Sequence, residues 1–209
     1  VGRLTGIDNI SQTAYKLGLG QSTGIELPEE VGIVASEEER EERGEIWNPG
    51  DVLQAAMGQA DNSFTPLQMA NYIATLANGG KRMKVHLLDS VSSYDYSEVT
   101  QVYQPEVIEN LNLSEDAVYA VTQGMRYVVT NGTAVDTFQG YEIEVAAKTG
   151  SAQIGQEAAN GVFVCYAPFD EPEIAVAVVV EKGGSGSAIA TIAKQVMDYY
   201  FTYSDNITD

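Results

Sequence analysis

The chain has 209 residues, of which 44% are hydrophobic and 20% are charged, proportions that suit one soluble domain with a sizeable core. Its formal net charge is −19, from 11 basic and 30 acidic residues, which argues against nucleic acid and anionic lipid as partners because both bind basic surfaces. No run approaches the roughly 18 apolar residues of a membrane span, and residues 1–4 do not resemble a signal peptide, so we expect any anchor or export signal to lie upstream.

The N-terminal segment combines a predicted helix with turns and a charged insert. Apolar residues at helical spacing predict a helix over residues 4–17, which ends at Gly18 and Gly20. A turn-rich stretch follows at residues 21–28. Residues 36–46 are rich in glutamate and arginine, and a solvated helix or loop is favoured there over a metal or partner site.

The middle of the chain contains two strong helix signals. Thr65, Pro66 and Gln68 form a capping box with proline at the first helical position, which predicts a helix that stops at residues 78–80. A second helix is predicted over residues 115–129, capped by Ser114, with Val118, Val121, Met125, Val128 and Val129 on its buried face. Between the two helices, residues 84–91 are predicted to form a strand.

The C-terminal part predicts a small antiparallel sheet closed by a helix. Strands are expected over residues 141–149, 161–167 and 173–181, and the short connector at 168–172 implies a hairpin. The glycine–serine stretch 183–187 is interpreted as a linker into a helix over 188–201, followed by a polar tail at 202–209. The fold class is therefore α+β, with helices packed on an antiparallel sheet.

Two isolated residues are interpreted as structural. Cys165 lies in an apolar run and is expected to be a small core residue rather than a nucleophile. His86 is the only histidine, so a histidine-based metal site or a Ser-His-Asp triad would rest on that residue alone. We expect neither, and no metal or cofactor is predicted.

The most informative stretch is Lys148-Thr149-Gly150-Ser151, at the end of the first predicted strand. Lys148 supplies a compact cation, and Thr149 supplies a hydroxyl that can donate to a carboxylate. Gly150 lets a ligand approach the backbone closely. The backbone N–H of Ser151 would then be free to donate to an oxyanion, which is worth about 3–4 kcal/mol when the donor is preorganised. A strand at the sheet edge leaves backbone groups available for a ligand in this way.

Several stretches, in this order, resemble the transpeptidase domain of penicillin-binding proteins, particularly the class B type. The order and spacing correspond over nearly the whole chain, from about Leu4 to Phe201. Two small departures are Ala60, where the family usually has glycine, and Ser151, where threonine is commoner. The matching stretches are residues 18–20, 23–28 with Glu30 and Gly32, 58–59, 65–70, 77–80, 124–125, 128–129, 132–134, 147–153, 163–168 and 172–176.

The resemblance implies acyl transfer without a cofactor. A serine attacks the penultimate D-alanine carbonyl of a peptidoglycan stem peptide, and β-lactams trap the same serine. Lys148 would orient the substrate carboxylate and assist proton transfer, Thr149 and Ser151 would donate hydroxyl groups to that carboxylate, and the Ser151 N–H would form half of the oxyanion hole. The resemblance also implies a location outside the cytoplasmic membrane and proteins of cell-wall elongation or division as partners.

The family's nucleophile motif is missing from these residues. No serine has a lysine three positions later, so Ser-x-x-Lys is absent, and Ser-x-Asn is expected just upstream of Val1. Ser93-Tyr94-Asp95 and Ser204-Asp205-Asn206 imitate the second motif, but neither has the expected position. We therefore expect the 209 residues to form the C-terminal portion of the domain and to be inactive alone. Two alternatives remain open: a serine D,D-carboxypeptidase or β-lactamase, and a non-catalytic receptor of the same fold.

Overall fold

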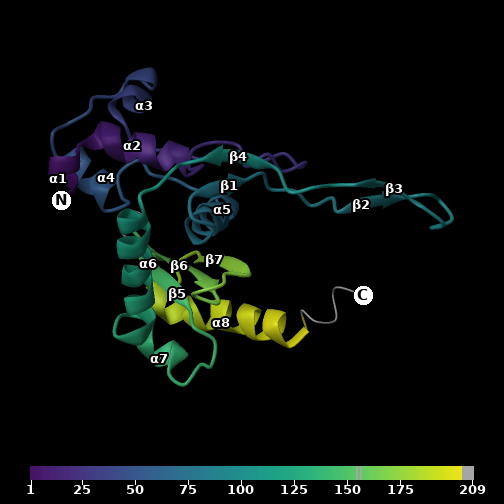
Figure 1. Ribbon diagram of the computed structural model, residues 1–209. Coiled ribbons are helices and arrows are strands. Elements are labelled where there is room, and N and C mark those ends of the chain that lie inside the picture. The colour runs from purple at the N-terminus through teal and green to yellow at the C-terminus, as the bar shows by residue number, and fades with distance from the viewer. Residues whose placement is uncertain (154, 156, 204–209) are drawn as a thin grey trace.

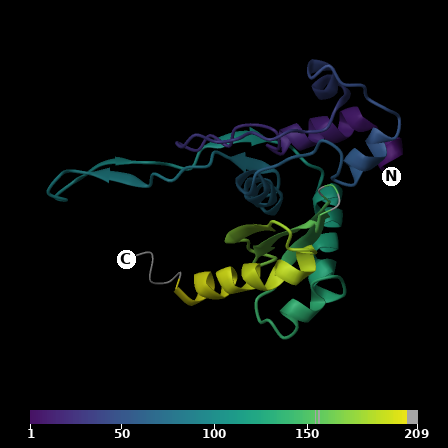
Figure 2. The same cartoon turned by 180° about the vertical axis from the view of Figure 1, so that it is seen from behind.

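A three-stranded antiparallel sheet forms the centre of the C-terminal half. The computed structural model describes residues 1–153, 155 and 157–203. Within them, β5 (Ala146–Ala152), β6 (Asn160–Ala167) and β7 (Ile174–Val180) lie side by side in that order. Figures 1 and 2 show α5 (Pro66–Ala77) on one face of this sheet and α8 (Gly186–Tyr203) on the other. The predicted α+β class is confirmed.

The two faces of β6 belong to two separate hydrophobic cores. Phe163 and Cys165 face α8, in a core that includes Ala193 and Met197. Val164 and Tyr166 face α5, in a core that includes Ile73 and Leu76. The alternation of side chains along a strand therefore gives β6 a helix to pack against on each side. Helix α6 (Glu115–Thr130) runs past β5 and contributes Met125 to the α5 core and Val129 to the α8 core.

Both strong helix predictions are confirmed. The capping box at the start of α5 is complete, with Gln68 N–H donating to Thr65 Oγ1 at 3.1 Å and Thr65 N–H donating to Gln68 Oε1 at 3.1 Å. Ser114 caps α6 by accepting from the Ala117 N–H at 3.2 Å. Met125 and Val129 are buried as expected, whereas Val121 is exposed, so the predicted apolar face of α6 is too wide.

The helix predicted over residues 4–17 is confirmed from Ile7 to Lys16, but it is interrupted at Gly6. Gly6 has φ 79°, which ends α1 (Gly2–Thr5) and sets the direction of α2 (Ile7–Lys16). The charged insert forms a short helix, α3 (Glu37–Glu42), capped by Ser36, and α4 (Asp51–Ala56) follows it.

The strand predicted over residues 84–91 is wrong for residues 84–89, and only Ser90 and Val91 are in a strand. Val85 N–H donates to Thr23 O at 3.0 Å and Leu87 N–H donates to a Glu26 carboxylate oxygen at 3.0 Å, so these donors serve the turn at 23–26 instead of a ladder. Two short antiparallel pairs lie on either side of residues 84–89. They are β1 (Lys81–Met83) with β4 (Val107–Asn110), and β2 (Ser90–Ser92) with β3 (Val99–Val102). The β2–β3 ribbon projects well beyond the rest of the chain (Figure 1).

The ends of the C-terminal elements differ from expectation by a few residues. Residues 141–145 are not part of β5, because Tyr141 N–H closes a turn onto Phe138 O after α7 (Val135–Phe138). Helix α8 starts inside the predicted linker and continues through residues 202 and 203 of the predicted tail. The imitation motif at Ser204, Asp205 and Asn206 lies outside the described residues. None of the described helices is long and apolar enough to cross a membrane.

Candidate functional site at the edge of strand β5

Strand β5 lies at the edge of its sheet and carries all four predicted site residues. It pairs with β6 over its whole length, with Lys148 opposite Val164 and Ser151 opposite Gly161. No other strand of the described chain pairs with its outer side. The position at the edge, predicted from the sequence, is therefore confirmed. The backbone groups on the outer side of β5 are those that a ligand would meet.

The carbonyl of Ser151 points to this outer edge. It accepts a hydrogen bond from Gln59 Nε2 at 3.1 Å, and Gln59 belongs to the turn after α4. In an antiparallel ladder the N–H and C=O of one residue point to the same side of the strand. The N–H of Ser151 therefore also faces the outer edge, where the sequence-based hypothesis needs it.

Lys148 and Thr149 present a cation and a hydroxyl at the same edge. Lys148 is exposed, and its Nζ donates to the Thr149 carbonyl. Lys148 enters none of the salt bridges among the described residues, so no carboxylate of this part of the chain neutralises its charge. Thr149 Oγ1 lies 2.8 Å from Thr133 Oγ1, on the loop between α6 and α7, which fixes the position of the Thr149 hydroxyl.

The start of β5 is held by an arginine from α6. Arg126 donates to Val145 O at 3.2 Å and to Glu144 Oε1 at 2.7 Å, both just before the strand. The strand is thus fixed at its first residues by Arg126 and near its last residues by Gln59. Hydrogen bonds to charged groups are among the stronger ones in proteins, so the pair with Glu144 orients the strand entrance.

Gln59 and Thr133 are the contacts that the sequence did not reveal. Both lie in stretches that match the family, Gly58-Gln59 and residues 132–134, but the pattern assigns them no partner. Their partners, Ser151 and Thr149, are 92 and 16 residues further along the chain. A contact over such distances depends on tertiary packing, which local sequence spacing does not encode.

The candidate site is an open edge and not a closed cavity. A cavity of about 550 Å³ lies between α5, α6 and the turn from β6 to β7. Tyr166 and Phe169 line it, and none of the four residues of the β5 edge does.

The residues that the sequence analysis set aside lie elsewhere. Cys165 is fully buried, and burial raises the pKa of its thiol to about 12, so it is a core residue as expected. His86 is exposed and its Nδ1 lies 2.9 Å from Leu88 O. Ser93 and Asp95 hydrogen-bond to each other at the tip of the β2–β3 ribbon. No group of three potential metal ligands occurs within the described residues.

Comparison with known proteins gives the same family from sequence and from structure. The family model described as Penicillin binding protein transpeptidase domain matches residues 1–198. Penicillin-binding protein 2A of Bacillus subtilis is 36% identical over 205 residues, covering 89% of this chain and 27% of that protein. Peptidoglycan D,D-transpeptidase MrdA of Escherichia coli K12 is 32% identical over 227 residues, covering 98% of this chain and 35% of that protein.

The solved structures include a complex between penicillin-binding protein PBP2 and MreC from Helicobacter pylori. It matches with a TM-score of 0.80 and 27% identity, over 96% of this chain and 37% of that one. The chain therefore spans about a third of the length of the curated relatives it matches. The family model covers nearly all of it, so the chain belongs to the penicillin-binding protein transpeptidase domain family, class B.

Proposed function

We propose that this chain supplies the substrate-binding strand of a peptidoglycan D,D-transpeptidase. The observation that carries the proposal is the arrangement at the β5 edge. The Ser151 N–H, the Lys148 ammonium group and the Thr149 hydroxyl belong to one edge strand, and the Ser151 carbonyl on that edge is held by Gln59. Family membership and the relative named peptidoglycan D,D-transpeptidase support the same reaction class.

In this proposal a serine attacks a D-alanyl carbonyl of the stem peptide and forms a tetrahedral intermediate. The Ser151 N–H donates to the developing oxyanion, a contribution of about 3–4 kcal/mol for a preorganised donor. Lys148 binds the terminal carboxylate of the donor peptide, with hydroxyl groups from Thr149 and Ser151. Gly150 has no side chain, so the substrate can lie close to the backbone between these groups. The leaving D-alanine departs, and an amine of a second stem peptide takes the acyl group.

The nucleophile is not among these 209 residues, because no Ser-x-x-Lys occurs in them. We therefore propose that the 209 residues are inactive alone and that an upstream part of the same domain completes the site opposite Lys148. In the whole protein, the location would be the extracytoplasmic face of the membrane, with an upstream anchor. The complex of Helicobacter pylori PBP2 with MreC supports a partner from the cell-wall elongation machinery.

Intact-mass spectrometry after incubation with a reactive β-lactam tests this proposal. It compares the 209 residues with the protein extended upstream, and a Lys148→Met variant of the extended protein serves as a site control. One covalent adduct on the extended protein, none on the 209 residues, and much slower formation in Lys148→Met are expected. An adduct on the 209 residues would place a nucleophile where we find none. The absence of an adduct on the extended protein would favour a non-catalytic relative.

A further inference from the structure

The charged insert at residues 36–46 is connected to the candidate site by polar contacts on both sides of the short backbone stretch from Gln59 to Asn62. These contacts begin at Arg40 on α3, whose guanidinium reaches two carboxylates. Its Nε lies 2.5 Å from Asp61 Oδ2 and one terminal nitrogen lies 2.6 Å from Asp51 Oδ2. The three side chains are only 15–19% exposed, so these ion pairs are better shielded from solvent than most surface pairs. Arg40 is therefore not part of a solvated face.

These ion pairs hold both ends of one short segment. Asp51 is the first residue of α4, and Asp61 follows the turn in which α4 ends. Arg43 adds a second contact to Asp61 at 3.1 Å, and the Arg40 guanidinium lies over the Trp47 ring at 5.2 Å. Because a single guanidinium binds Asp51 and Asp61 together, the distance between the ends of this segment is restrained.

Asn62, the residue after Asp61, restrains the same turn. It accepts from the Ala35 N–H at 3.0 Å and donates to Ala55 O at 3.2 Å and to Gln59 O at 3.0 Å. The turn also contains Ala60 with φ 59°, a backbone conformation that non-glycine residues rarely adopt. The backbone of Gln59 is thus held by Asn62, independently of the contact that the Gln59 side chain makes with β5.

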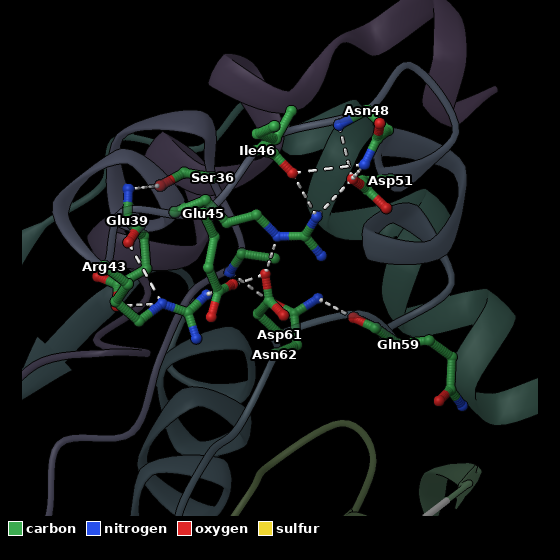
Figure 3. A network of polar contacts seen from close by, with 12 residues as sticks. Ser36, Glu39, Arg43, Glu45, Ile46, Asn48, Asp51, Gln59, Asp61 and Asn62 are labelled. Atoms are coloured by element: carbon green, nitrogen blue, oxygen red, sulfur yellow. Dashed lines mark hydrogen bonds and ion pairs between the residues drawn. The ribbon is translucent and has the colours of Figure 1, made fainter. Parts of the chain in front are cut away.

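Figure 3 shows the Gln59 side chain on the side of this network away from Arg43. Gln59 Nε2 donates to the Ser151 carbonyl at 3.1 Å, which connects the two parts of the chain at the candidate site. The peptide plane after Ser151 is therefore oriented by a residue that Arg40, Asp61 and Asn62 hold in place. Because the N–H of Ser151 faces the same edge as its carbonyl, the donor proposed for the oxyanion depends on this contact.

We propose that Gln59 is a positioning residue for the Ser151 N–H, and that Arg40 positions Gln59 through Asp61. The inference rests on the proposed acyl-transfer function. It goes further by assigning a role to the charged insert, which is connected to β5 through the Gln59 turn. Gln59 does not touch the reacting atoms in this scheme; it acts on the orientation of the strand edge.

The test uses the protein extended upstream and measures acylation by a fluorescent penicillin, separating non-covalent affinity from the acylation rate constant. In Gln59→Met, which keeps the length but loses the donor, the rate constant is expected to fall about three- to tenfold, the effect of one neutral hydrogen bond. The affinity is expected to change little, because Lys148 and Thr149 are untouched. Gln59→Lys, which restores an N–H donor of similar reach, is expected to recover most of the rate. Gln54→Met, at an exposed glutamine on α4, is the matched control.

The role of Arg40 is tested by coupling. Arg40→Met is expected to lower the same rate constant, and the Arg40→Met/Gln59→Met double variant is expected to be no slower than Gln59→Met alone. Multiplicative losses would overturn the connection through Asp61. A rate constant unchanged in Gln59→Met, or a loss that falls on affinity instead, would overturn the role of Gln59.

Hydrogen exchange makes the inference testable even if the proposed function fails. Amide exchange in a peptide that contains Ser151 is expected to be faster in Gln59→Met and Arg40→Met than in the unmodified protein, and unchanged in Gln54→Met. No acylation of the unmodified protein would contradict the proposed function, whereas unchanged exchange at Ser151 would contradict the positioning role. The two failures are therefore distinguishable.

Discussion

Gly186, the first residue of α8, lies directly against the backbone of Gly150 on β5. A β-carbon on Gly186 would stand 2.7 Å from the Gly150 nitrogen and 2.1 Å from the Val162 oxygen. The absence of a β-carbon on Gly186 therefore allows the start of α8 and the candidate site strand to approach each other closely. The three atoms nearest to a β-carbon on Gly150 would all belong to Val162 of β6, so the close approach of α8 depends on Gly186.

A Gly186→Ala substitution is expected to destabilise the protein by about 1–3 kcal/mol, the usual cost of overpacking a filled interior. The backbone oxygens cannot move aside without shifting β5. Gly124→Ala is the matched control, because a β-carbon at Gly124, in the exposed face of α6, would meet nothing within 4 Å. Gly124→Ala should be neutral or stabilising by up to about 1 kcal/mol. Urea unfolding of both variants measures the difference, and equal midpoints would show that α8 can move without cost.

The pair of hydroxyl groups on Thr133 and Thr149 predicts a binding effect. Thr133→Val removes the group that holds the Thr149 hydroxyl at 2.8 Å. We expect non-covalent affinity for a penicillin to fall about three- to tenfold in the protein extended upstream, consistent with the loss of one hydrogen bond. Thr133→Ser keeps the hydroxyl and should bind like the unmodified protein. If Thr133→Val binds as tightly as Thr133→Ser, the contact with Thr149 has no part in ligand binding.

The sequence predicted those parts of the structure that depend on local chemistry. The capping box at Thr65, the cap at Ser114 and the β6–β7 hairpin each follow from residues close together in the chain, and all three are present. The edge position of Lys148 followed from strand order. The strand predicted at 84–91 failed over residues 84–89 because its donors bond to residues 23–26, more than 60 positions earlier. Local patterns do not contain that information.

The charged insert at residues 36–46 likewise shows that local sequence does not predict which side chains pair near the candidate site. Glutamate and arginine alternate in residues 36–46 as they would on a solvated helix, and α3 is indeed a short helix. Only the fold reveals that Arg40 turns inward to Asp51 and Asp61, 11 and 21 residues away. Charge composition predicts that a segment is polar, but it does not predict which charges are paired.

The ion pair at Asp61 predicts a dependence of stability on pH. The hydrogen bond from Arg40 holds the pKa of Asp61 below its ordinary value of 3.8, although partial burial acts in the opposite direction. Because the folded pKa is the lower one, the stabilisation is present above the unfolded pKa and is lost as pH falls through the folded pKa. We expect Asp61→Asn to cost about 1 kcal/mol at pH 7 and to converge with the unmodified protein in acid. Thermal unfolding from pH 7 to pH 3 measures this, with Asp89→Asn, at an exposed aspartate, as the control.

The buried thiol of Cys165 predicts slow chemical labelling. Burial raises its pKa to about 12, and the side chain is fully inaccessible to solvent. A thiol reagent at pH 8 should therefore label Cys165 only at the rate at which the sheet opens, and labelling should become complete and rapid in guanidinium. Rapid stoichiometric labelling in the absence of denaturant would show that β6 is accessible in the native protein.

The packing of β6 against a helix on each face also fixes the register in which β5 pairs with β6. A slip of β6 by one position would turn Phe163 and Cys165 toward α5 and Val164 and Tyr166 toward α8, so both cores would be wrong at once. A slip of one residue therefore loses apolar packing in both cores. The placement of Ser151 opposite Gly161, and with it the position of the candidate donor relative to the Gln59 amide, is selected by apolar residues that never meet a substrate.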